Sequence, residues 1–266
     1  MQACANISWI FIEAGPTLAA RCLAAKKAGF SVVESDWPQG NLPAETYRAA
    51  LDEAGLQAIL LNCYQGDTSA GECGFTAEPG HEDRYKESLD ITLQYARTIG
   101  AKKIHLLSGR DLSSQGVTKA EQEKTLIKNL QESLPALQQA NVIALIEPIN
   151  SFSKPGYFLN NFETACRVIS SVGSPLVKMQ LDLFHLQMTE GNLVNNIKKF
   201  LPFTGHVQVA QAPHRHEPSM AGEVNYKYVL EQLYIAGYRG HIGCEYKPSV
   251  TSESSLGWIK EWGLHF

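Results

Sequence analysis

The sequence predicts a single (β/α)8 barrel, a fold of the α/β class. Three observations point to it: the chain has 266 residues, short apolar runs rich in β-branched residues alternate with longer amphipathic stretches, and this pair of patterns occurs eight times. Eight units leave about 33 residues for each, which suits one βα repeat. Eight repeats favour closure into a barrel over an open doubly wound sheet.

The predicted strands are the short apolar runs. They span residues 3–8, 30–34, 57–62, 103–107, 142–146, 176–181, 203–209 and 241–244. The predicted helices are the amphipathic stretches. They span residues 16–28, 43–54, 81–99, 119–140, 161–171, 192–199, 225–236 and 254–261. Gly55 and Gly100 end predicted helices and Pro43 begins one, in keeping with the usual preferences at helix termini.

Two segments depart from this regular pattern. Pro135 falls inside the predicted helix 119–140, so we expect that helix to be kinked or split. Residues 63–80 form a long, glycine-rich connection after the third strand. Loops of this length are often functional lids, and this one would open onto the carboxyl-terminal face of the barrel, so we expect a lid rather than a plain surface excursion. No linker divides the chain, which predicts one domain over residues 1–266.

The composition is that of an ordinary globular protein. Apolar residues make up 44% of the chain and charged residues 19%, with a formal net charge of -4 and a pI of about 6.1. A weakly acidic chain without a Lys/Arg cluster is not expected to bind nucleic acid. No apolar run reaches the roughly 18 residues of a membrane helix, so no membrane partner is expected. The six cysteines are scattered and form no CxxC motif, which predicts reduced thiols and a cytoplasmic location.

Oxygen-bearing side chains stand at the ends of four consecutive predicted strands. They are Glu147, Asp182, Gln208 and Glu245, at intervals of 35, 26 and 37 residues, each close to one βα unit. Active sites of βα barrels lie at the carboxyl ends of the strands. Neighbouring strand ends are only about 5 Å apart, so these side chains are expected to converge near the barrel axis.

A convergent cluster of this kind predicts a metal site. Three carboxylates repel one another strongly at short range unless they are protonated or neutralised, and a divalent cation would neutralise them. A ligand set made only of oxygen atoms favours Mg2+ or Mn2+ over Zn2+. The alternative is that each acidic residue merely caps a helix or faces solvent.

Several short motifs lie around these four residues and elsewhere in the chain. Those at the strand ends are Glu147-Pro-Ile-Asn150, Asp182-Leu-Phe-His185, Gly205-His-Val-Gln-Val-Ala210 and Gly243-Cys-Glu245-Tyr. Others are Ala5-Asn-Ile-Ser-Trp9, Ile104-His-Leu, His216-Glu-Pro-Ser and Gly222-Glu-Val-Asn-Tyr226. Together they resemble the sugar-phosphate isomerase and epimerase barrels of the xylose-isomerase-like superfamily and, more narrowly, the hydroxypyruvate isomerases. The related tagatose and psicose epimerases carry a histidine at the position of Gln208, which favours the hydroxypyruvate isomerase branch.

The resemblance implies interconversion of hydroxypyruvate and 2-hydroxy-3-oxopropanoate (tartronate semialdehyde) through an enediolate. A carboxylate would move the proton, and the metal would stabilise the developing oxyanion. We expect Glu147 and Glu245 to transfer protons as well as bind the metal. Asp182 and Gln208 are expected to act as metal ligands only.

Other residues are candidates for contact with a small hydroxy or keto acid substrate. His185 follows Asp182 at the mouth of the sixth strand, where it would either bond a substrate oxygen or satisfy the backbone of its loop. Arginine can grip a carboxylate with two nitrogens, and we favour Arg215 over Arg110 because its loop adjoins Gln208. Trp9 and His105 are further candidates for the pocket wall, although buried aromatic residues are more often part of the core.

Three other functions compete with this interpretation. The first is an isomerase or epimerase of another small sugar or keto acid, because the motifs do not choose among small polyols. The second is a metal-dependent phosphodiesterase like the DNA-repair endonuclease barrels, disfavoured by the few histidines at strand ends. The third is a non-catalytic binding protein, disfavoured by the intact set of four oxygen ligands. The oligomeric state stays open, a homo-oligomer included.

Overall fold

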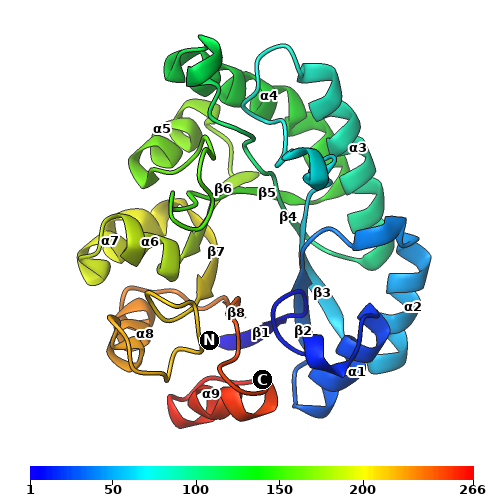
Figure 1. Ribbon diagram of the computed structural model, residues 1–266, viewed down its shortest axis with the longest axis vertical. Coiled ribbons are helices and arrows are strands. Elements are labelled where there is room, and N and C mark those ends of the chain that lie inside the picture. The colour runs from blue at the N-terminus through cyan, green and yellow to red at the C-terminus, as the bar shows by residue number, and fades with distance from the viewer.

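The computed structural model describes residues 1–266, apart from the side chain of Asn41. Eight parallel strands form one closed barrel in which each strand pairs with its neighbours in chain order and β8 pairs with β1 (Figure 1). The strands are β1 (Gln2–Asn6), β2 (Val32–Ser35), β3 (Gln57–Asn62), β4 (Lys103–His105), β5 (Ile143–Ile146), β6 (Val177–Asp182), β7 (Thr204–Val209) and β8 (His241–Cys244). The predicted single-domain barrel is confirmed.

A ring of helices surrounds the barrel (Figure 1). They are α1 (Leu18–Lys27), α2 (Ala44–Ala54), α3 (Glu82–Ile99), α4 (Lys119–Ala140), α5 (Phe162–Val172), α6 (Leu183–Thr189), α7 (Leu193–Phe200), α8 (Tyr226–Ile235) and α9 (Gly257–Glu261). All eight predicted helical stretches are present. The last predicted stretch divides into a 3-10 turn, Glu253–Leu256, followed by α9.

Helix α6 was not expected from the sequence. This helix starts directly after β6, without the loop that usually separates a strand from its helix. Asp182 Oδ1 caps it by accepting a hydrogen bond from the backbone nitrogen of Phe184 at 2.8 Å. The result is that His185 lies in the first turn of a helix rather than in a loop.

Pro135 was expected to kink or split the helix 119–140, because proline removes one helical hydrogen bond. The structure nevertheless keeps α4 as one helix of 22 residues, so the helix is not split. Pro135 lies on the exposed side, where water can bond the carbonyl that has lost its partner. The N-terminus of the helix is stabilised by a capping box that Thr118 and Glu121 form.

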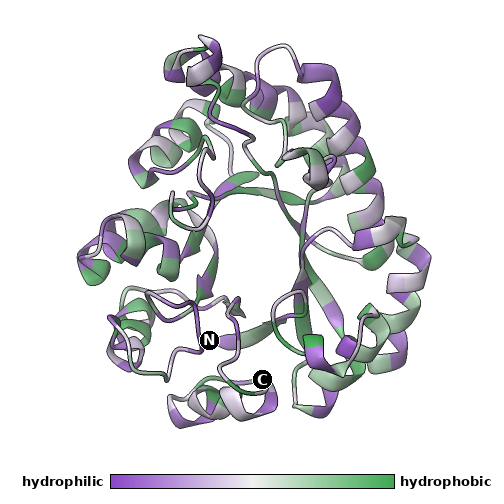
Figure 2. Cartoon of the chain, viewed as in Figure 1, coloured by the Kyte–Doolittle hydropathy of each residue, from purple (hydrophilic) through white to green (hydrophobic). Residues whose placement is uncertain are grey.

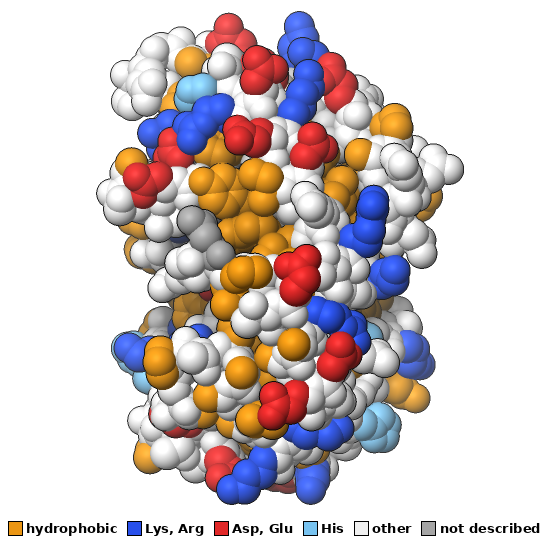
Figure 3. Space-filling view, turned by 90° about the vertical axis from the view of Figure 1, so that its right-hand side faces the viewer, with side chains coloured by type: hydrophobic (Ala, Val, Ile, Leu, Met, Phe, Trp, Pro, Cys, Tyr) orange, Lys and Arg blue, Asp and Glu red, His pale blue; other side chains and the backbone are white. Residues whose placement is uncertain are grey.

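Apolar residues fill the space between the barrel and its helices. Figure 2 shows hydrophobic residues along much of the strand ring and an alternation of hydrophobic and hydrophilic residues along the helices, as expected for helices that bury one face. On the face shown in Figure 3, acidic and basic side chains are interspersed with apolar ones. No helix in the described part of the chain is long and apolar enough to cross a membrane. All six cysteines are free thiols.

The long connection after β3 has two different halves. Residues 73–78 are buried, and Ala77 donates a backbone hydrogen bond to Ser108 O at 2.8 Å. Glu78 accepts two bonds from the Arg110 side chain, at 3.0 and 3.1 Å. The second half is therefore packed against the loop after β4, and a lid would have to come from the more exposed residues 64–72.

Candidate active site at the strand ends

The four oxygen-bearing residues predicted from the sequence occupy neighbouring strand ends. Glu147 follows β5, Asp182 ends β6, Gln208 lies in β7 and Glu245 follows β8. Asp182 pairs directly with Gln208 in the sheet, and Gln208 with Gly243 two residues before Glu245. All four side chains are buried. The barrel register thus brings them to one end of the barrel, as expected.

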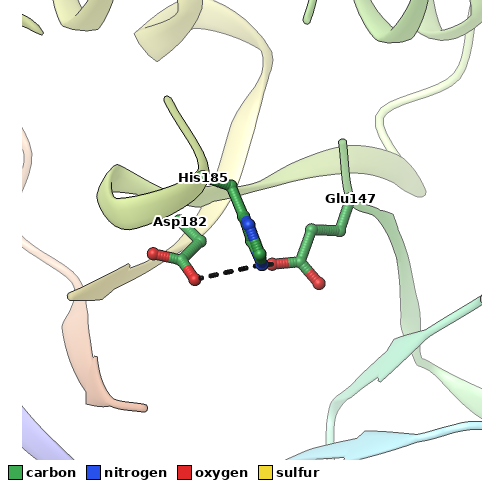
Figure 4. A group of neighbouring side chains, drawn as sticks. All are labelled: Glu147, Asp182 and His185. Carbon is green, nitrogen blue, oxygen red and sulfur yellow. Dashed lines mark ion pairs between the residues drawn. The ribbon is translucent and has the colours of Figure 1, made fainter. Parts of the chain in front are cut away.

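Three of the buried groups are close enough to hold one metal ion. Glu147, Asp182 and His185 each offer a ligand atom, and these atoms all lie within 4.8 Å of one another. Figure 4 shows the three side chains pointing toward one another from β5, β6 and α6. His185, expected at the substrate, is therefore part of the tightest cluster.

The hydrogen bonds of His185 define its tautomer. Asn150 Nδ2 approaches His185 Nδ1 at 2.5 Å, and an amide NH2 group can only donate, so Nδ1 accepts and the proton lies on Nε2. In this tautomer Nε2 is a donor, so a metal ion in the cluster would be held by the carboxylates of Glu147 and Asp182 and not by His185. His185 Nε2 lies 3.6 Å from Asp182 Oδ2 and 4.0 Å from Glu147 Oε1. Burial, Arg215 and His105 hold the pKa of His185 well below its usual value, so the ring is neutral.

Arg215 lies on the other side of the cluster and is paired with two of its carboxylates. Its Nη2 donates to Glu245 Oε2 at 2.7 Å and to Asp182 Oδ2 at 3.3 Å. The guanidinium carbon lies 4.2 Å from the centroid of the Trp9 ring and 4.9 Å from that of Phe184. Trp9 therefore lines the site through its contact with Arg215.

His105 lies at the end of β4, beside Glu147. Its Nδ1 lies 3.2 Å from Asn62 Oδ1 and 3.6 Å from Glu147 Oε2. Asn62 is held in turn by Asp36, whose Oδ1 accepts a hydrogen bond from Asn62 Nδ2 at 2.7 Å. Burial and the Lys154 ammonium lower the pKa of His105 to about 3, so the ring is neutral near pH 7.

The electrostatics of the cluster fit a bound cation. Glu147, Asp182 and Glu245 face a single guanidinium, that of Arg215. Burial and the neighbouring Asp182 raise the pKa of Glu147 well above its usual value, and burial also raises the pKa of Asp182 and of Glu245. Among the described residues, Glu147 Oε1 has no hydrogen-bond partner. Buried carboxylates so close together, with one oxygen that has no donor, are consistent with a metal site.

Gln208 lies on β7, in register with Asp182, and its side chain is buried. Its Oε1 accepts a hydrogen bond from Gln180 Nε2 at 2.7 Å, and its Nε2 donates to Glu34 Oε1 at 2.7 Å. Its amide orientation is thus defined by two buried neighbours. The predicted role of Gln208 as a metal ligand stays a prediction.

The sequence analysis missed three polar residues near the site. Glu34 ends the predicted strand 30–34, and as an acidic residue directly after Val32-Val33 it carried the same signal as the four strand-end residues. Asn6 is a polar residue within the apolar run 3–8. Lys154 gave no signal, because it lies in the irregular segment after β5. Its ammonium lies 5.6 Å from the Tyr157 ring, and its charge contributes to the low pKa of His105.

A closed parallel barrel with buried carboxylates at its carboxyl end is typical of metal-dependent isomerases and their relatives. The chain belongs to the xylose isomerase-like TIM barrel family, whose model matches residues 22–262.

Three relatives show where in this family the chain falls. A Danio rerio protein provisionally named hydroxypyruvate isomerase is 40% identical, over 98% of this chain and 95% of its own length. The 2-oxo-tetronate isomerase of Cupriavidus necator is 38% identical, over 97% of both chains. The hydroxypyruvate isomerase of Escherichia coli is 36% identical, over 96% of both chains. The chain is therefore a full-length homologue of isomerases that act on small keto acids.

One solved structure is similar over nearly the whole chain. It is described as an AP endonuclease of family 2 from Brucella melitensis, with 35% identity and a TM-score of 0.91 over 98% of both chains. The overall arrangement of strands and helices is thus shared over nearly the whole length of both proteins.

Proposed function

We propose that this protein is a metal-dependent hydroxypyruvate isomerase, which interconverts hydroxypyruvate and tartronate semialdehyde. The observation that carries the proposal is the buried cluster of Glu147, Asp182 and His185, in a chain homologous to hydroxypyruvate isomerases over nearly its full length. Such a site offers carboxylates for proton transfer and room for one hard cation.

Glu147, Asp182, Gln208 and Glu245 are the proposed metal ligands, with His185 as a further neighbour. Their oxygen-rich set favours Mg2+ or Mn2+. A bound divalent cation would supply electrostatic stabilisation of the negative charge that develops on the substrate oxygens.

Proton transfer is assigned to the two glutamates. The reaction removes a proton from the hydroxymethyl carbon of hydroxypyruvate, leaves an enediolate, and returns a proton to the neighbouring carbon. Glu147 is the stronger candidate for the base, because its Oε1 has no donor among the described residues. Its raised pKa also makes it a better proton acceptor than an ordinary carboxylate once it is ionised. Glu245, already held by Arg215, is the candidate for the second transfer.

The neutral histidines are suited to orient the substrate. His185 presents Nε2–H toward the carboxylate cluster, so it can donate to a substrate oxygen without repelling a nearby cation. Neutral His105 lies beside Glu147 and is proposed to line the pocket with Trp9.

Arg215 is the proposed anchor of the substrate carboxylate. Its Nη2 is bound to Glu245 and Asp182 and its Nε donates to the Glu245 carbonyl oxygen at 3.5 Å, which leaves Nη1 to meet the substrate carboxylate. The half-buried Lys154 is a second cation on the β4 side of the pocket, which would further favour an acid over a neutral sugar.

The test is to incubate the purified protein with hydroxypyruvate and Mg2+ or Mn2+ and to follow tartronate semialdehyde by NMR. We expect conversion with at least one of these metals, and loss of conversion after chelation. Absence of product with both metals would contradict the proposal.

A second candidate acts on a four-carbon acid, since the Cupriavidus necator 2-oxo-tetronate isomerase is 38% identical to this chain. Both reactions shift a carbonyl in a small keto acid and use the same carboxylate chemistry. A comparison of kcat/KM for hydroxypyruvate and 2-oxo-tetronate under the same conditions decides between them. A value at least tenfold higher for 2-oxo-tetronate would replace the first proposal by the second.

A further inference from the structure

A buried polar network lies inside the barrel, directly below the candidate active site. Its centre is Glu34 on β2, which is fully buried. Glu34 Oε2 lies 2.6 Å from His206 Nε2, and Glu34 Oε1 accepts hydrogen bonds from Gln208 Nε2 at 2.7 Å and Asn6 Nδ2 at 3.2 Å. Residues of β1, β2 and β7 therefore meet at one carboxylate.

This network reaches two of the proposed active-site residues. Asn6 Nδ2 also donates to Glu245 Oε1 at 3.2 Å, so one amide bridges Glu34 and Glu245. Gln208 is bonded directly to Glu34, and its Oε1 receives the bond from Gln180. Glu34 is not one of the proposed metal ligands, and it reaches the site only through Asn6 and Gln208.

Glu34 decides how the two amides are oriented. Both of its oxygens are engaged, Oε2 by His206 Nε2 at 2.6 Å and Oε1 by Gln208 Nε2 at 2.7 Å and Asn6 Nδ2 at 3.2 Å. A carboxylate oxygen accepts hydrogen bonds, and only the NH2 end of a side-chain amide donates them. Gln208 must therefore turn its NH2 group toward Glu34 and its Oε1 away from it, and Asn6 must present its NH2 group to Glu34 and Glu245.

A glycine makes this close contact feasible. A Cβ atom at Gly243 of β8 would lie 2.5 Å from Glu34 Oε1 and 2.7 Å from Gln208 Cγ. Both are closer than real Cβ contacts, so a side chain at this position would push Glu34 and Gln208 apart. The approach of β2 and β7 side chains across β8 therefore depends on Gly243.

We propose that Glu34 is a positioning residue, whose carboxylate fixes the amide of Gln208 with its oxygen available to the metal and holds Glu245 through Asn6. The inference rests on the proposed metal site. Groups that orient metal ligands are commonly worth about 10- to 100-fold in metal affinity or activity.

The test replaces Glu34 by methionine, which has a similar length but no strong acceptor. We measure Mn2+ binding to the substrate-free protein by electron paramagnetic resonance and, separately, kcat and KM. In E34M we expect the dissociation constant for Mn2+ to rise about 10- to 100-fold and kcat to fall more than KM changes. The matched control is V33A, which truncates the buried neighbour of Glu34 on the same strand and leaves every polar contact in place.

A conservative variant separates orientation from charge. In E34Q the amide oxygen can still accept from Gln208 and Asn6 while its NH2 group faces His206. His206 can then accept through Nε2 by moving its proton to Nδ1, an atom without a partner among the described residues. We expect E34Q to bind Mn2+ within about fivefold of the wild type, and a loss as large as that of E34M would contradict the proposal.

If E34M fails to fold, G243A serves in its place, because it keeps all polar groups and displaces the Glu34 carboxylate and Gln208, whose atoms would lie 2.5–2.8 Å from the added Cβ. It is expected to weaken Mn2+ binding about tenfold or more, as is usual for groups that orient ligands. Wild-type protein that binds no Mn2+ would overturn the proposed metal site together with this inference. Wild-type protein that binds Mn2+, with E34M or G243A binding within threefold of it, would overturn this inference alone.

Discussion

Glu147 and Glu245 differ in what holds their carboxylates. Glu245 accepts bonds from Arg215 and Asn6, whereas Glu147 Oε1 has no donor among the residues that the structure describes. Both are buried next to other acids, and both have raised pKa values. The two glutamates are therefore suited to different parts of one proton-transfer reaction.

Replacing either glutamate by glutamine tests this assignment. Glu147→Gln and Glu245→Gln remove a proton acceptor with little change in shape, so each is expected to lower kcat by about 10²- to 10⁴-fold. The measurement is steady-state kinetics with hydroxypyruvate. Glu231→Gln, on the exposed side of α8, is the control. Near-normal turnover in either active-site variant would remove that residue from proton transfer.

Arg215 has two tasks in the proposed site, pairing with Glu245 and Asp182 and anchoring the substrate. A lysine keeps the charge but has a single nitrogen and cannot serve both groups at once. Arg215→Lys is therefore expected to raise KM for hydroxypyruvate about tenfold, as for loss of a charged hydrogen bond. Arg239→Lys, whose side chain bonds only backbone carbonyls of Tyr234 and Tyr238, should leave KM unchanged. A change in kcat with no change in KM would contradict the anchor role.

The burial of His105 should make the free energy of unfolding depend on pH. Its pKa is about 3 in the folded protein and near 6.5 when unfolded, so between these values the unfolded chain binds more protons. Stability contributed by neutral His105 is therefore present above pH 6.5 and lost as the pH falls toward 3, by up to about 1.4 kcal/mol per pH unit. We expect the free energy of unfolding, measured by urea denaturation, to fall less steeply from pH 7 to pH 4 in His105→Gln than in the exposed variant His214→Gln. Equal slopes for the two variants would count against a buried neutral His105.

At the scale of elements, residues 73–78 of the loop after β3 are held by backbone and side-chain hydrogen bonds and by the ion pair of Glu78 with Arg110. The buried carboxylate of Glu78 accepts from both Nε and Nη2 of Arg110. Arg110 is therefore paired with Glu78, whereas Arg215 lies beside Asp182 and Glu245, which agrees with the preference for Arg215 as the anchor. If part of this loop closes over the site, it is the more exposed segment, residues 64–72.

Arg110→Ala should release this loop. Without the guanidinium, Glu78 is left as a buried charge lacking its main partner, so residues 73–78 are expected to open more often. Hydrogen–deuterium exchange of these amides should become at least tenfold faster, a factor that corresponds to about 1.4 kcal/mol of lost local stability. The control is Arg97→Ala on the exposed side of α3. Unchanged exchange at residues 73–78 would show that the loop is held by other contacts.

Most elements could be predicted because hydrophobic periodicity reports which face of a strand or helix is buried. The helix α6 escaped prediction because Asp182 both ends β6 and caps the helix, so no loop marks the boundary. Glu34 ends the predicted strand 30–34 and could have been identified like the other strand-end residues. Its partners on β1 and β7 could not, because contacts across the barrel have no spacing rule in the sequence. The same holds for Lys154, whose place beside His105 depends on the path of an irregular segment.

At the scale of the whole molecule, metal binding and protonation compete for the same carboxylates. The pKa values of Glu147, Asp182 and Glu245 are raised, so the metal-free folded protein retains protons there to higher pH than an ordinary carboxylate would. A cation must displace those protons, and its affinity therefore rises with pH. The metal should act as a stabilising ligand whose effect grows toward alkaline pH.

Thermal unfolding checks this expectation. The rise in Tm caused by about 1 mM Mn2+ should be larger at pH 8 than at pH 5.5. Sodium chloride at matched ionic strength is the control. A rise that is equal at both pH values would indicate that the cation binds elsewhere.

We propose that this barrel moves a proton on a small keto acid by means of buried carboxylates at its strand ends. The decisive measurement is solvent exchange at the hydroxymethyl carbon of hydroxypyruvate, followed by NMR in D2O with Mg2+ or Mn2+. We expect deuterium incorporation by the wild type, and a rate at least about 10²-fold lower for Glu147→Gln. Failure of the wild type to exchange this proton with either metal, or equal exchange by the two proteins, would contradict it.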